Sequence, residues 1–287
     1  MGRFYISRFY AFLMVLALLP AVFVSCEEMG ENYNPFAYVE NGKYLGDGVL
    51  INGVVWAPVN CGYDELRYPM GKLYQFGRKY GQGYNDSDEH DAVYPGSDDF
   101  VTKLPVDPSE GSGTVNANKF YISPEYPHTW IANSGDDNSD WTKLWNAGTY
   151  DKPVKTAYDP CPDGWRVPTA NEFFKLDPIL TDYNTTVTSK WVKYGHNGKA
   201  GRWFSGDVPY ASGMADAVFF PAAGCRSFNN GSCLARGNQG FYFASDVTTS
   251  GVPSKGAYIL YFGSGDYDTY VDSSQLASGY SVRCVKE

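Results

Sequence analysis

The sequence predicts an α+β protein built from short antiparallel strands, a few short helices and long irregular loops. Hydrophobic residues make up 43% of the 287 residues and charged residues only 19%, so the chain can bury a substantial core. Aromatic residues reach 17%, and 31 Gly and 17 Pro are spread along the chain, which favours turns and short elements over a coiled coil. Recognisable strand patterns and one well-marked helix start complete the assignment.

The net charge limits the classes of partner. The chain has 23 Lys plus Arg against 32 Asp plus Glu, a formal charge of −9. Binding to a phosphate backbone needs concentrated positive charge. We therefore expect no nucleic-acid partner.

The first 25 residues predict a lipoprotein signal peptide. Arg3 and Arg8 precede an apolar run of about fourteen residues, from Ala11 to Val24, which suits a secretion signal better than a membrane span. Ser25 then precedes Cys26, and in bacterial lipoprotein signals this cysteine becomes the lipidated first residue. An ordinary signal peptide cleaved nearby is the alternative. Acyl chains on Cys26, at roughly 0.8 kcal/mol per buried methylene, would anchor the protein without a span.

A polar tether is expected after the signal, so that residues 26–45 hold the lipidated cysteine and tether and residues 46–287 form one domain. Glu27 and Glu28 resemble the surface-export signal of lipoproteins in the Bacteroidetes, and a solvated linker is the other interpretation. Without residues 1–25, which hold two Arg and no acid, the balance becomes 21 − 32 = −11. We expect a lipid-anchored protein of the outer membrane, exposed at the cell surface.

Two segments carry strand patterns, residues 49–56 and residues 257–262. In the second, alternation would bury one set of side chains and present Ile259 and Tyr261 on the opposite face. The set expected in the core is Tyr258, Leu260 and Phe262.

One helix start is well marked. Thr169 stands three residues before Glu172, the spacing of a capping box, so residues 170–176 should be helical with Phe173 and Leu176 directed inward. The remaining chain is expected to hold turns and short strands.

A second, shorter helix is expected after Asp140, because Leu144 and Trp145 can lie on one face behind such a cap. Residues 86–118, in contrast, show no helical period. This long irregular stretch agrees with a loop-rich fold.

Cysteines other than Cys26 form an odd set, which leaves at least one thiol if all bridges are internal. Exported cysteines usually form disulfides. Cys225 and Cys233 could close a small loop, whereas Cys161 and Cys284 would close a large ring, and spacing alone does not choose. There is no C-x-x-C pair and there are only three His, so we expect no metal site and no cofactor.

The motifs of common enzymes are missing from the sequence. It contains no G-x-S-x-G elbow, P-loop, dinucleotide fingerprint or H-E-x-x-H. A nucleophilic site would have to use His90, His128 or His196, of which the first two stand in settings typical of solvated loops. Acidic residues are plentiful, but their spacing indicates no glycosidase pair. We therefore expect no enzymatic activity.

Four blocks of sequence resemble the Fibrobacter succinogenes major paralogous domain, and they occur in that family's order over about residues 46–287. Phe243 stands where family members often have Trp, which keeps an aromatic side chain. The resemblance implies a C-type-lectin-like fold, related to that of the sulfatase-modifying enzymes. The blocks are Val55–Cys61 with Gly71–Gly77, Asp159–Thr169, Phe220–Arg226 and Gly279–Val285.

The resemblance also implies a disulfide between Cys161 and Cys284, with Trp165 beside it and Arg283 at the end of the last strand. Closing so long a loop would contribute roughly 4 to 5 kcal/mol to stability. Such a bridge would matter in a domain rich in loops.

The other cysteines are left with several interpretations. Cys61 could pair with Cys225 or Cys233 or remain a thiol. The sulfatase-modifying enzymes use a close cysteine pair, but the spacing and neighbours of Cys225 and Cys233 differ from theirs, so a structural role is expected.

Calcium needs a separate test, because many C-type lectins bind sugar through it. Asp136, Asn138 and Asp140 alternate suitably for oxygen ligands, yet Trp141 and Ala147 occupy the positions where an EF-hand has Gly and a bidentate Glu. The E-P-N, Q-P-D and W-N-D strings of calcium-dependent lectins are absent. We assign no metal ligand, with a structural calcium as the alternative.

A ligand-binding surface is expected in the C-terminal region, where aromatic residues are mixed with Gly, Ser, Asn and Asp as in antibody paratopes. Tyr rings can also stack on sugars. Ile259 and Tyr261 are favoured because alternation places them opposite the predicted core residues; the alternative is that such aromatics belong to the core. The candidate set is Phe228, Leu234, Phe241, Ile259, Tyr261, Tyr267 and Tyr270.

The sequence therefore predicts a surface-anchored lipoprotein with a lectin-like, adhesin-type domain that recognises an extracellular glycan or protein. One alternative is a structural or accessory subunit of a surface fibre, which would use an unpaired strand edge. The other is an enzyme, which would show a deep pocket with converging polar groups and perturbed pKa values.

Overall fold

The structure, a computed structural model, describes residues 34–84, 100–101, 120–123, 128–131, 140–176, 188–206, 217–248, 256–265 and 269–287. The described residues from Phe36 to Glu287 belong to one compact unit. The expected signal peptide, Cys26, His90, Asp136, Asn138 and Tyr267 lie outside the described residues. Among the helices of the described part, none is long and apolar enough to cross a membrane.

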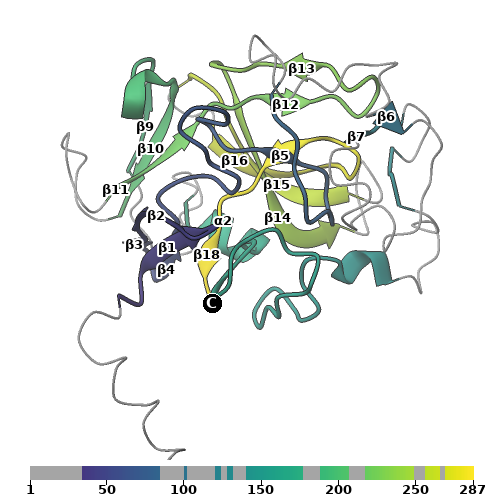
Figure 1. Cartoon of the computed structure of the whole chain (residues 1–287), viewed down its shortest axis with the longest axis horizontal. Helices are drawn as coiled ribbons and strands as arrows, with labels where there is room; N and C mark the ends of the chain where they lie inside the picture. The colour runs from purple at the N-terminus through teal and green to yellow at the C-terminus, as the bar shows by residue number, and fades with distance from the viewer. Residues whose placement is uncertain are drawn as a thin grey trace, which may run out of the picture. The chain divides into compact units, whose positions relative to one another are not determined.

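Within Phe36–Glu287 the described chain is mostly β, with one short α-helix and long loops (Figure 1). The predicted short strands and irregular loops are confirmed, but helices contribute less than an α+β class suggests. The helical elements are α2 (Ala170–Phe174) and the 3₁₀ turns η2 (Asp140–Lys143) and η4 (His196–Gly198). The strands are β1 (Ala37–Glu40), β2 (Lys43–Asp47), β3 (Val49–Ile51), β4 (Val54–Trp56), β5 (Leu73–Tyr74), β6 (Phe100–Val101), β7 (Phe120–Tyr121), β8 (Trp165–Arg166), β9 (Thr188–Val192), β10 (Gly201–Ser205), β11 (Ala217–Pro221), β12 (Cys225–Arg226), β13 (Cys233–Leu234), β14 (Gly240–Thr248), β15 (Gly256–Phe262), β16 (Thr269–Gln275), β17 (Tyr280–Ser281) and β18 (Val285–Lys286).

The strands form several small sheets. The largest has the order β16-β15-β14-β17-β5, the next β3-β4-β18-β8, and the third β11-β10-β9. The pairs β14–β17 and β6–β7 are parallel, and the other named pairs are antiparallel. Because β17 and β18 belong to different sheets, the last residues of the chain connect the five-stranded sheet to the four-stranded one.

Two hydrophobic clusters pack against this framework, and the five-stranded sheet contributes to both. Along β14, Tyr242 belongs to one cluster and Phe243 to the other; along β15, Leu260 and Ile259 divide in the same way. Since successive side chains of a strand point to opposite faces, the sheet is covered on both faces. Representative members of the first core cluster are Tyr38, Phe76, Trp145, Trp165, Phe243 and Ile259, and of the second Trp56, Phe173, Phe204, Phe220, Tyr242 and Leu260.

The segment predicted as one strand, residues 49–56, is a hairpin of β3 and β4. Asn52 and Gly53 form its turn, and both have positive φ, 48° and 77°. Positive φ at both central residues is what a type I′ turn requires, and Asn-Gly is its preferred sequence. The prediction of a single strand is wrong because the Asn-Gly turn divides the apolar run into two paired strands.

The predicted capping box of α2 is confirmed. The backbone N–H of Thr169 donates to Glu172 Oε2 at 2.8 Å, and Arg166 holds the same carboxylate through Nη1 and Nη2 at 2.8 and 2.7 Å. Phe173 and Leu176 are fully buried as expected, although the helix ends at Phe174 and not at residue 176. A five-residue helix is too short to be stable alone, so the cap and the packing hold it.

Two other boundaries differ from the sequence prediction. The helix expected after Asp140 is only the 3₁₀ turn η2, and Leu144 and Trp145 are buried directly after it. Residues 37–45, expected to be tether, form β1 and part of β2 within the unit Phe36–Glu287. The predicted tether therefore contains folded chain.

Buried arginines hold several of the loops together. Arg202 donates from Nη1 to Ser189 Oγ at 2.8 Å and from Nη2 to the carbonyl of Gly263 at 2.9 Å. Arg226 donates from Nη2 to the carbonyl of Gly83 at 2.7 Å. A guanidinium has five donors, so one side chain can satisfy carbonyls that no strand pairs. The fully buried arginines are Arg78, Arg202, Arg226 and Arg283.

Candidate functional site

Four aromatic rings lie side by side across neighbouring strands of the five-stranded sheet, and we call Phe241, Tyr261, Tyr270 and Tyr280 the aromatic row. Phe241 is opposite Tyr261 in the β14–β15 register, and Tyr261 is opposite Tyr270 in the β15–β16 register. Ring centroids are 5.1 Å apart for Phe241 and Tyr261 and 4.7 Å for Tyr261 and Tyr270. Phe241 also stacks on Tyr280 of β17, with centroids 5.1 Å apart.

Exposure increases along the aromatic row towards β16, which is the last strand of its sheet. Tyr280 is buried, Phe241 and Tyr261 are half-buried, and Tyr270 is 43% exposed. The row therefore extends from the first core cluster to the surface. The core holds the inner rings in place, and the outer ring, Tyr270, is accessible to a ligand in solution.

Hydrogen bonds orient the rings of the aromatic row. Gln239 Nε2 donates to the hydroxyl of Tyr261 at 2.7 Å, and the hydroxyls of Tyr280 and Ser274 are 2.7 Å apart. Burial raises the pKa of Tyr280, so this phenol stays neutral and acts as a hydrogen-bonding group. This arrangement offers apolar ring faces and phenol hydroxyls, which suits binding by stacking.

The structure distributes the seven predicted ligand-binding residues unevenly. It brings Phe241, Tyr261 and Tyr270 together, whereas Leu234, 50% exposed, lies on β13. Phe228 is half-buried, with its ring 4.5 Å from that of His128. Tyr267 lies outside the described residues.

The expectation that alternation leaves Ile259 on an open face is wrong. Ile259 is 5% exposed and belongs to the first core cluster. β15 is an inner strand of a sheet covered on both faces, so alternation selects between two cores and not between core and solvent. Tyr261, two residues further on, is half-buried and packs against the same cluster.

Sequence reasoning missed Tyr280, which completes the aromatic row. It stands in the block Gly279–Val285, which was interpreted only as a structural ending. Its place beside Phe241 depends on the parallel pairing of β17 with β14 through Ser281 and Tyr242. No local pattern predicts a parallel pairing between such distant segments.

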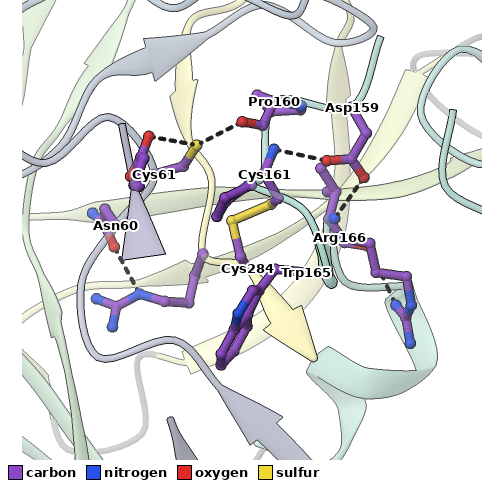
Figure 2. The surroundings of a disulfide bond; sticks show 12 residues. Asn60, Cys61, Asp159, Pro160, Cys161, Trp165, Arg166 and Cys284 are labelled. Carbon is purple, nitrogen blue, oxygen red and sulfur yellow. Dashed lines mark hydrogen bonds between the residues drawn. A yellow bond between two sulfur atoms is a disulfide. The ribbon is translucent and has the colours of Figure 1, made fainter. Parts of the chain in front are cut away.

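The disulfide implied by the resemblance is present: Cys161 and Cys284 are bonded, with Cα atoms 5.9 Å apart (Figure 2). Trp165 is buried in the same core cluster, and Arg283, which precedes Cys284 in the sequence, donates from Nε to Asn60 Oδ1 at 2.9 Å. The bridge therefore joins the segment before β8 to the segment before β18.

The small loop considered for Cys225 and Cys233 is not closed by a bond. The two residues stand on the paired strands β12 and β13, and both are thiols. Burial raises the pKa of the Cys225 thiol to about 12, so it is protonated at neutral pH. The Cys225 thiol is half-buried and protonated, which agrees with a structural role. Cys61 is a thiol as well.

Asp159 is a buried carboxyl group next to the disulfide. Its Oδ1 accepts from the Cys161 N–H at 2.8 Å and from Lys155 Nζ at 3.3 Å, and its Oδ2 accepts from the Val167 N–H at 2.8 Å. Burial raises the pKa of Asp159 to about 6, in spite of these donors. The folded state therefore binds this proton more tightly than the unfolded chain does.

This pKa predicts a pH dependence of stability. The stabilisation from protonated Asp159 is fully present below its ordinary pKa of about 4 and is lost as the pH rises through about 6. The free energy of unfolding in urea at pH 4, 5, 6 and 7 provides the measurement. Between pH 4 and pH 7 this free energy should fall by about 2 to 3 kcal/mol more in the wild type than in Asp159→Asn, because one pKa unit corresponds to about 1.4 kcal/mol. A constant difference, or one that rises with pH, would contradict the assignment.

Two shallow hollows lie next to each other on either side of Pro69 and Met70. One is open to solvent and has Arg67 and Arg236 in its wall; the other has Lys199 and Arg283 in its wall. Among the described residues, no Asp or Glu lines either hollow. The paired acids that a glycosidase needs are therefore not found there.

Comparisons of the sequence with protein-family models, with curated proteins and with solved structures find no match. The resemblance to the Fibrobacter succinogenes major paralogous domain therefore stays a prediction.

Proposed function

We propose that this protein is a surface lipoprotein whose domain binds an extracellular glycan or protein through the aromatic row and performs no catalysis. The observation that carries the proposal is the set of rings in contact across four adjacent strands, ending at Tyr270 with 43% of its surface exposed. A solvent-facing tyrosine supported by buried rings is a typical anchor for recognition.

The side chains of the aromatic row are already held in place before a ligand binds, and this supports a binding function. Tyr has only two side-chain torsions, and the Tyr261 ring is already held by Phe241, Tyr270 and Gln239. A ligand would then lose little affinity to side-chain ordering. Flat ring faces with hydroxyl groups at their edges suit a sugar ring or a protein surface.

The rest of the proposal depends on sequence resemblances. It gives residues 46–287 a C-type-lectin-like fold and places a lipid on Cys26, so that the domain faces the extracellular space from the outer membrane. It includes no cofactor. The fibre-subunit alternative is favoured by one feature, the position of β16 at the end of its sheet, where another chain could add a strand.

A substitution at the exposed end of the row tests the binding function. An array of glycans and extracellular proteins first identifies a target of the full-length chain in detergent. Tyr270→Ala should weaken binding to that target by at least about tenfold, or about 1.4 kcal/mol. Dissociation constants from surface plasmon resonance give the comparison.

Tyr194→Ala is the matched control, because Tyr194 is 78% exposed and belongs to neither the aromatic row nor its sheet. It should leave affinity unchanged. Equal affinities of wild type and Tyr270→Ala would remove the row from the site. Binding to a second copy of the chain, abolished by a proline in β16, would favour the fibre subunit.

A further inference from the structure

Three cysteines from distant parts of the sequence meet in the first core cluster. The sulfur atoms of Cys61, Cys161 and Cys284 all lie within 4.8 Å of one another, and all three residues are buried. Two of them form the disulfide, and Cys61 keeps its thiol. Figure 2 shows the Cys61 sulfur near the bridge, with its contact to the carbonyl oxygen of Pro160.

Backbone hydrogen bonds fix Cys61 in this place. The N–H of Ala57 donates to the carbonyl of Cys284 at 2.9 Å, and the N–H of Cys61 donates to the carbonyl of Val282 at 2.9 Å. The segment after β4 therefore runs beside the segment before β18. This backbone pairing keeps the Cys61 sulfur next to the disulfide, although Cys61 is not bonded to either of the two other sulfurs.

Proton acceptors surround the Cys61 thiol. Its Sγ is 3.3 Å from the carbonyl oxygen of Pro160 and 3.6 Å from Glu40 Oε1, and the Tyr74 hydroxyl donates to it at 3.3 Å. Glu40 is held by the Gly62 N–H at 2.8 Å. A carboxylate next to a thiol is the arrangement needed to take up its proton.

A second polar group connects this carboxylate to the disulfide. The Tyr38 hydroxyl donates to Glu40 Oε2 at 3.1 Å and lies 3.6 Å from Cys284 Sγ. Glu40 and Tyr38 thus form a path between the thiol of Cys61 and one sulfur of the bridge. Tyr38 is fully buried, so the end of the path next to the bridge is shielded from water.

We propose that Cys61 and the Cys161–Cys284 disulfide form a thiol–disulfide exchange centre in which Cys61 can replace either bonded cysteine. In the step that the contacts favour, Glu40 accepts the proton of Cys61 and the Cys61 thiolate attacks Cys161 Sγ. The Cys61–Cys161 bond forms as the Cys161–Cys284 bond breaks, and Cys284 leaves as a thiolate. Tyr38 delivers the proton to Cys284 and is reprotonated by Glu40, so no external oxidant or reductant is needed.

Exchange would change which parts of the chain are held covalently. The native bridge joins the segment before β8 to the segment before β18, whereas a Cys61–Cys161 bridge joins the segment after β4 to the segment before β8 and removes the covalent link to the C-terminal segment. Burial raises the pKa of the Cys61 thiol, which keeps the thiolate rare and the native bridge dominant. The centre therefore stores an alternative disulfide that forms when a native partner is lost or the core opens.

Single-cysteine variants of the full-length chain test this inference. After oxidation with glutathione disulfide, non-reducing proteolysis and mass spectrometry should find Cys61–Cys161 in most Cys284→Ala molecules and Cys61–Cys284 in most Cys161→Ala molecules. Cys225 and Cys233 should remain open to alkylation after unfolding. A Cys284→Ala chain in which Cys161 carries glutathione while Cys61 remains a thiol would overturn the proposal.

The wild-type chain provides a measurement that does not depend on the folding of a variant. After incubation at pH 9, acid quenching and alkylation, bridges containing Cys61 should exceed bridges containing Cys225 or Cys233 by at least tenfold. Equal amounts of the two kinds would indicate unspecific scrambling. Either that result or the absence of Cys61-containing bridges would overturn the proposal, whatever the outcome of the binding experiment with Tyr270→Ala.

Discussion

Replacement of both Cys161 and Cys284 by alanine is expected to lower the free energy of unfolding by about 5 kcal/mol. The bridge spans a sequence separation of 123 residues, and it restricts the unfolded chain more strongly than a short loop would. Native domains are stable by only about 5 to 15 kcal/mol, so the loss would be a large fraction of the total. Urea unfolding without reductant, at pH 6 or below, measures it.

The double substitution is needed because Cys61 lies beside the bridge. Each single variant should lose less stability than the double variant, since the remaining cysteine can pair with Cys61. Cys225→Ala is the control, because Cys225 is a half-buried thiol outside the centre. A loss below about 2 kcal/mol in the double variant would show that the bridge contributes little beyond local contacts.

Arg283→Met is expected to lower the free energy of unfolding by about 4 kcal/mol. The guanidinium of Arg283 is fully buried and donates to the carbonyl of Ala57 at 2.8 Å and to that of Phe219 at 2.7 Å. It also donates to Asn60 Oδ1 at 2.9 Å. Methionine fills a similar volume but removes the donor of three hydrogen bonds to buried acceptors, and a buried acceptor left unsatisfied costs about 1 to 3 kcal/mol. Urea unfolding again gives the difference.

Arg67→Met is the matched control for this arginine. Arg67 is exposed, and its guanidinium lies 5.1 Å from the centre of the Tyr68 ring. An exposed contact of this kind is worth about 0.5 to 1 kcal/mol, so the control should change stability little. Similar losses in the two variants would show that Arg283 does not hold the loops together.

Local signals predicted several elements correctly. The Thr169–Glu172 spacing identified the start of α2, because a capping box depends on neighbouring residues only. The Asn52-Gly53 turn also carries a local signal, because this dipeptide favours the positive φ angles that both residues adopt. The disulfide between Cys161 and Cys284 came from the resemblance, since the spacing of the cysteines left several pairings open.

Non-local pairing explains what the sequence could not predict. Phe241, Tyr261 and Tyr270 were named as separate candidates, and only the order and register of β14, β15 and β16 place their rings in contact. Ile259 follows the same alternation as Tyr261, but it is buried. The alternation of side chains along a strand cannot show whether the opposite face of the sheet is covered by other residues. Tyr280 joined through a parallel pair that no local pattern indicates.

The central claim is that the ligand contacts the exposed end of the aromatic row. Hydroxyl-radical footprinting of the full-length chain, with and without its array-identified ligand, tests this directly by measuring tyrosine oxidation in a mass spectrometer. The account predicts at least threefold protection of Tyr270 and no protection of Tyr194. Protection of Tyr194 or of the hollow beside Met70, with Tyr270 oxidised equally in both samples, would contradict it.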